Sequence, residues 1–185
     1  LRLRAAYIFN DRDNQTPQST YSWVTTDMFL APSQRTNLPY GFTQDKVQLR
    51  ADYKAAQRIT TSAGYDYDSV QRTFQEVDTT RENTVWGRLA SRHLDMLDLT
   101  LRLAHSDRSF SSYQAVPEIT PPENPLLRKY NMADRTRDRA ELRANVAATE
   151  SISIGFQVDA SKDDYSNSTI GLTSDKERLT ALVLL

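Results

Sequence analysis

The feature that most constrains the fold of this chain is an alternation of apolar and polar side chains with a period of two residues. It is plainest between residues 97 and 103, where four leucines alternate with Asp98, Thr100 and Arg102. Successive side chains leave opposite faces of an extended strand, so this period predicts a β-strand with one apolar and one polar face. The pattern recurs along the chain, and its segments are joined by alternately short and long connections. The sequence therefore predicts an all-β, up-and-down antiparallel sheet.

Eight segments carry this pattern and are expected to form strands. Their approximate ranges are 1–10, 47–54, 59–68, 81–90, 97–103, 139–148, 152–160 and a last segment that reaches residue 185. Long connections are expected at 11–43 and 106–134, and a shorter loop is expected around Asp163 and Asp164. Two segments, 132–149 and 86–96, leave a helix open, since the first is rich in strong helix formers. The apolar residues from Ala140 to Ala148 nevertheless follow a period of two and favour a strand.

Alternation by itself fits both a soluble β-sandwich and a transmembrane β-barrel. Three features favour the barrel. The strand lengths are near the roughly 9–11 residues that a tilted strand needs to cross a bilayer. The connections alternate between short and long, whereas the Greek keys of sandwiches mix them. Aromatic residues, including Tyr7, Phe9, Tyr65 and Tyr67, lie towards the long-loop ends of strands, as in the aromatic girdle of a membrane barrel. A soluble β-sandwich binding module remains the alternative.

Composition excludes several other classes of function. The net charge of −1 gives no basic bias, so we expect no nucleic-acid partner. Without cysteine the chain can form no disulfide, no thiolate metal site and no c-type haem attachment. No apolar run is long enough for a transmembrane helix. We also find no catalytic constellation and no cofactor or metal motif. The chain is therefore expected not to be an enzyme.

Both ends of the chain interrupt the pattern. Leu1 and Leu185 lie inside strand-like segments. We therefore expect residues 1–185 to be a single domain that is truncated at both ends. On this interpretation the chain is an arc of about eight strands from a larger barrel, and it lacks the closure that removes the edges of a sheet.

Two stretches resemble the MtrB/PioB family of decahaem-associated outer-membrane barrels. One runs through Gly64-Tyr65-Asp66-Tyr67-Asp68, Arg72–Val77 and Asn83–Leu89, and the other is Glu123–Arg135. The resemblance implies a large barrel in the bacterial outer membrane that encloses a periplasmic multihaem c-type cytochrome. It further implies a second, extracellular multihaem cytochrome and a role in extracellular electron transfer, serving metal reduction or Fe(II) oxidation. Haem is then expected in the partner and not in this chain. A porin-like diffusion channel is the main alternative.

In this interpretation the polar face of each strand lines the lumen. Its charged side chains are expected to face the enclosed cytochrome or the water around it, and each is also explained by simple solvation of a wet lumen. The candidate lumen-facing and partner-facing residues are Arg2, Arg4, Arg50, Asp52, Lys54, Arg102, Arg139, Glu141, Arg143, Gln157 and Asp159.

Overall fold

One curved antiparallel sheet dominates the chain. The computed structural model describes residues 1–26, 29–30, 34–94, 96–114, 124, 126–149, 151–165, 168, 170, 172 and 175–184. The long strands are β1 (Arg2–Arg12), β6 (Phe42–Ala56), β7 (Ile59–Arg72), β8 (Thr79–Leu94), β9 (Leu97–Phe110), β10 (Arg135–Ala147), β11 (Ser153–Asp164) and β12 (Asp175–Leu184). They pair in the order β1-β6-β7-β8-β9-β10-β11-β12, so each long strand neighbours the next one along the chain. The predicted all-β, up-and-down architecture is confirmed.

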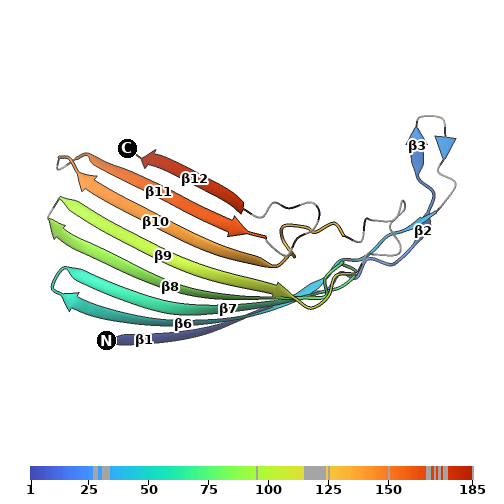
Figure 1. Cartoon of the computed structure of the whole chain (residues 1–185), viewed down its shortest axis with the longest axis horizontal. Helices are drawn as coiled ribbons and strands as arrows, with labels where there is room; N and C mark the ends of the chain where they lie inside the picture. The colour runs from blue at the N-terminus through green and yellow to red at the C-terminus, as the bar shows by residue number, and fades with distance from the viewer. Residues whose placement is uncertain are drawn as a thin grey trace.

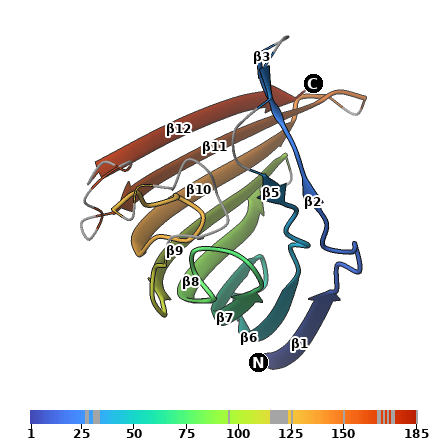
Figure 2. The same cartoon turned by 90° about the vertical axis from the view of Figure 1, so that its right-hand side faces the viewer.

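The sheet is an open arc. Figure 1 shows the short turns gathered at one end of the strands and the long connections at the other. Figure 2 shows the sheet curving from β1 to β12 without the two edge strands meeting. Within the described residues, the only other paired strands are β2 (Thr20–Tyr21) with β5 (Arg35–Thr36) and β3 (Val24–Thr26) with β4 (Phe29–Leu30). In that part of the chain no second sheet packs on the long one, which leaves the β-sandwich alternative without support.

At the long-connection end the strands extend further than predicted. Strand β9 continues to Phe110, although a loop was expected from residue 106. Strand β11 includes Asp163 and Asp164, which were expected to lie in a loop, and β7 continues to Arg72. In these stretches charged and hydroxyl side chains replace the apolar ones while the backbone ladder continues, as in the pair Arg108 and Arg135. Apolar alternation therefore marks the extent of the apolar face and not the end of hydrogen-bonded pairing.

The helix left open for residues 132–149 does not form. Strand β10 pairs with β9 on one side and with β11 on the other over its whole length. The pairs of Ala140 with Leu103 and of Leu142 with Leu101 set apolar side chains next to one another on one face. Strand pairing on both sides thus overrides the intrinsic helix propensity of Ala, Glu, Leu and Arg.

Among the described residues the long strands enclose no hydrophobic core. The buried apolar residues in the described part of the chain are Val77, Met132, Ala133 and Tyr165, and all of them lie in connections at the long-connection end. Large apolar side chains on the long strands are instead exposed: Leu103 is 53% exposed and Leu179 is 74% exposed. So large an exposed apolar face needs an apolar neighbour.

Candidate functional site

The two faces of the sheet differ completely in chemistry. The pairing registers join residues across all eight strands into rows. One row is apolar throughout: Leu3, Ala51, Ala63, Gly87, Leu103, Ala140, Ala160 and Leu179. The row one residue away, which points to the other face, is polar throughout: Arg2, Asp52, Ser62, Arg88, Arg102, Glu141, Asp159 and Thr180. We call these faces the outer face and the inner wall.

The apolar belt of the outer face ends along an oblique line towards the long-connection end of the strands. On β1 the belt extends to Phe9, which lies six residues beyond Leu3, whereas on β9 it ends at Leu103, the residue in the same row as Leu3. From β9 to β12 the next row of this face towards the long-connection end is polar: His105, Asp138, Lys162 and Glu177. A shift of six residues is about 20 Å along a strand, and the spacings from β1 to β9 add up to about 19 Å, which gives a strand tilt of about 45°. This value is close to the tilt of strands in membrane barrels.

Tyrosines lie at this edge of the apolar belt, towards the long-connection end of the strands. The Tyr65 hydroxyl donates a hydrogen bond to Asn83 Oδ1 at 2.6 Å, and the Tyr7 hydroxyl donates one to Asp45. Each ring therefore lies beside the apolar belt while its hydroxyl meets a polar group. This arrangement is the one that an aromatic side chain takes at a membrane interface.

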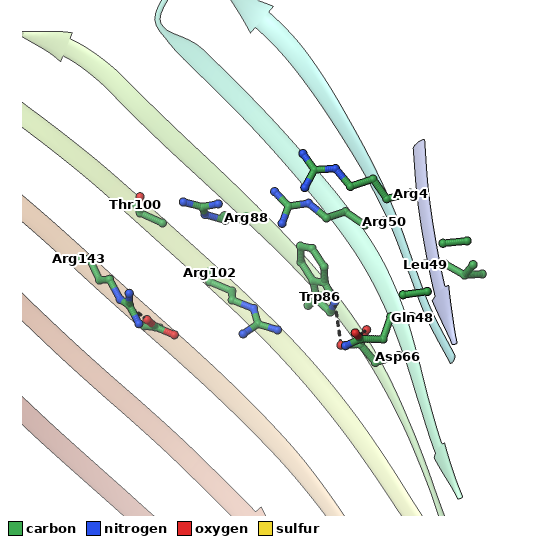
Figure 3. Close-up of a pocket in the computed structure, with 13 residues that line it drawn as sticks. Arg4, Gln48, Leu49, Arg50, Asp66, Trp86, Arg88, Thr100, Arg102 and Arg143 are labelled. Carbon is green, nitrogen blue, oxygen red and sulfur yellow. Dashed lines mark hydrogen bonds and ion pairs between the residues drawn. The ribbon is translucent and has the colours of Figure 1, made fainter. Parts of the chain in front are cut away.

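The inner wall holds a cavity of about 540 Å³ that is lined from six neighbouring strands, β1 and β6 to β10. Ser62 and Glu141 of the polar row are buried and Arg88 and Arg102 are half-buried, whereas Ala63, Gly87 and Leu103 of the apolar row are exposed, as expected if the inner wall is the concave face. Figure 3 shows the guanidinium groups of Arg4, Arg50, Arg88, Arg102 and Arg143 around this hollow, with Trp86 at its centre.

Trp86 is positioned by a glycine and a carboxylate. An added Cβ at Gly64 would lie 2.3 Å from Cζ2 of Trp86, so only glycine leaves room for the indole across β7. The indole Nε1–H donates to Asp66 Oδ2 at 3.2 Å. The guanidinium carbons of Arg102 and Arg50 lie 5.1 and 5.7 Å from the ring centroid, within the range of cation–π attraction.

Most of the candidate residues predicted from the sequence form ion pairs within the wall. Arg50 and Arg4 pair with Asp52 at 2.7 and 3.3 Å. Arg139 pairs with Asp159 at 2.5 Å. Arg143 pairs with Glu141 at 2.5 Å. Arg2, Lys54, Arg102 and Gln157 share this face through the registers Arg2↔Asp52, Lys54↔Thr60, Arg102↔Glu141 and Arg143↔Gln157. That these side chains contact a partner stays a prediction.

Two important residues of the wall, Trp86 and Arg88, were missing from that prediction. The sequence places Thr84, Trp86 and Arg88 on one face of a strand and Val85, Gly87 and Leu89 on the other. The apolar set marks the outer face, as on every other strand, and this rule would have assigned Trp86 and Arg88 to the inner wall. The tryptophan obscured the assignment because its ring is itself largely apolar.

A second cluster of charged side chains lies at the long-connection end of the inner wall. Residues 126–134 fold against β9, where Arg108 donates to the carbonyl oxygen of Ala133 at 2.9 Å and also to that of Tyr130. Arg135 pairs with Glu82 at 2.7 Å. Lys129 pairs with the buried Glu76. These contacts involve the Glu123–Arg135 stretch of the family resemblance, whose residues 123 and 125 lie outside the described part.

The described residues contain neither a metal-ligand cluster nor a membrane-spanning helix. In those residues no three His, Cys, Asp or Glu side chains converge where they could hold a metal ion. No helix in the same residues is long and apolar enough to cross a membrane.

A tilted sheet with an apolar, tyrosine-edged outer face and a charged concave wall defines an arc of an outer-membrane β-barrel. Comparison with known proteins agrees: residues 1–183 match the family described as "Putative outer membrane beta-barrel porin, MtrB/PioB". The chain is also similar to the outer membrane protein MtrB of Shewanella baltica (strain OS185), with 34% identity over 177 residues. That match covers 96% of this chain and 25% of the relative, so the chain spans about a quarter of the relative's length. The chain belongs to the MtrB/PioB family and to the outer membrane.

Proposed function

We propose that this chain forms part of a barrel wall that encloses a multihaem c-type cytochrome and supports electron transfer across the outer membrane. The observation that carries the proposal is the pair of adjacent rows, one apolar and one polar over all eight strands. Such a wall can face lipid on one side and a hydrophilic occupant on the other. The family resemblance supplies the identity of that occupant.

In this proposal the wall does no redox chemistry. The haems belong to the enclosed cytochrome, and a second, extracellular multihaem cytochrome receives or delivers electrons at the outer surface. The barrel keeps lipid away from the electron path and holds the cytochrome in place. Because its inner wall is rich in ion pairs, the wall presents fixed charges that a protein surface can complement.

The porin-like channel remains the second candidate, because the family description names a porin and a charged wall also suits a water-filled pore. One experiment separates the two. The intact barrel protein is extracted from outer membranes in mild detergent, affinity-purified and stained for haem. Enclosure predicts a stoichiometric haem protein and no steady ion conductance after reconstitution into a planar bilayer. A haem-free barrel that conducts ions would refute the sheath and support the channel.

A further inference from the structure

We propose that Arg88 and Arg102 form an anion-binding site on the inner wall that docks carboxylate groups on the surface of the enclosed cytochrome. This inference rests on the proposed function, since it names the chemistry by which the wall holds its occupant. It starts from a pairing that is unfavourable in the isolated sheet.

Arg88 and Arg102 lie directly opposite one another across β8 and β9. Like charges in directly opposed positions destabilise an antiparallel pair. Both side chains are half-buried on the concave face, where water screens their repulsion less than on an open surface. Among the described residues, neither guanidinium has a carboxylate within ion-pair distance. Arg102 contacts the ring of Trp86 instead.

The same sheet shows how such a pair is neutralised elsewhere. Arg108 and Arg135 are also directly opposed, but Glu82 lies 2.7 Å from Arg135 and 3.9 Å from Arg108. Arg108 in addition donates to two backbone carbonyl oxygens. Glu82 therefore bridges this second arginine pair, whereas no carboxylate of the described residues bridges Arg88 and Arg102.

The surroundings of Arg88 and Arg102 fit a carboxylate. The cavity they line also receives Arg4 and Arg50, which pair with Asp52, and Arg143, together with the carboxylates Asp66 and Glu141. Asp66 accepts the indole N–H of Trp86, and Glu141 is held by Arg143. The cavity therefore keeps an excess of positive charge, and guanidinium groups bind carboxylates with two parallel hydrogen bonds. The occupant that this charge fits is an acidic patch on the protein inside the barrel.

The test uses the intact barrel protein in its native membrane and the double variant Arg88→Gln/Arg102→Gln. The neutral side chains remove the mutual repulsion, so the barrel is expected to fold at least as well, which heat-dependent mobility in gel electrophoresis checks. Complexes are purified over a series of salt concentrations, and haem per barrel is measured. We expect retention of the cytochrome to be roughly tenfold weaker, the effect of losing one charge-assisted pair.

Two further variants make the result specific. Arg88→Lys/Arg102→Lys keeps the charge and is expected to restore most of the retention. Arg81→Gln removes an arginine from the outer face of the same strand β8 and is expected to match the wild type. Equal salt dependence of the wild type and the double glutamine variant would overturn the docking site and leave the sheath intact. A wild-type barrel without any haem would overturn both the sheath and this site.

Discussion

Replacing Gly64 by alanine is expected to destabilise the barrel, because Trp86 packs directly across this glycine. An alanine Cβ at position 64 would lie 2.3 and 2.4 Å from two ring atoms of Trp86 and 2.8 Å from the carbonyl oxygen of Leu49. The indole would have to move by about 1 Å, because carbon atoms in contact are normally about 3.5 Å apart. That movement breaks the 3.2 Å hydrogen bond from the indole to Asp66 and weakens the stacking of Arg102 on the ring.

We expect Gly64→Ala to lower the free energy of unfolding by about 1–3 kcal/mol. Overpacking costs about 1–3 kcal/mol, and a lost hydrogen bond to a carboxylate adds to that. The intrinsic gain on replacing glycine in a strand, about 0.5–1 kcal/mol, offsets part of the cost. The measurement is urea unfolding of the intact protein in lipid vesicles, followed by intrinsic fluorescence.

Gly87 provides the matched control for this prediction. It pairs with Ala63 on the neighbouring strand, and an added Cβ would meet no heavy atom within 4 Å. Gly87→Ala is therefore expected to leave stability unchanged or raise it by up to about 1 kcal/mol. Equal effects of the two substitutions would refute the argument that Trp86 is packed across Gly64.

Three further predictions test other parts of the molecule. Leu101→Arg places a charge in the apolar belt and should destabilise the barrel in vesicles by about 2–4 kcal/mol in urea titrations, a cost that a lumen-facing substitution at Thr100 should not show. Asp163→Asn removes the bidentate partner of Arg137 and should cost about 1–2 kcal/mol in the same titration, and a change below 0.5 kcal/mol, roughly the surface level, would count against it. Arg108→Ala should speed proteolytic cleavage within residues 126–134, because it frees the carbonyl oxygens that hold this segment, and an unchanged digestion pattern would contradict that role.

Much of the fold could be predicted because its determinants are local. A period of two assigns each side chain to a face without any knowledge of its neighbours, and the leucines between 97 and 103 show which face is apolar. Short turns then force consecutive strands to pair, so the up-and-down order follows from the connection lengths. The candidate residues Arg139, Glu141 and Arg143 are on the predicted inner side for the same reason.

The remaining features depend on register, which alternation does not determine. The opposition of Arg88 and Arg102 and the placement of Trp86 across Gly64 appear only when β7, β8 and β9 are aligned. A slip of two residues would preserve every face and remove both contacts. The fold of residues 126–134 also escapes prediction, because it depends on Arg108 and Glu76, which are distant in the sequence.

Site-specific photo-crosslinking shows whether the inner wall faces a cytochrome. A photoreactive phenylalanine analogue is placed at position 100 on the inner wall, or at position 101 on the outer face of the same strand, in the intact protein in its native membrane. An enclosed cytochrome predicts a haem-staining crosslinked product from position 100 and none from position 101. Haem-staining product from neither position, or from both equally, would contradict the assignment of the inner wall to a cytochrome.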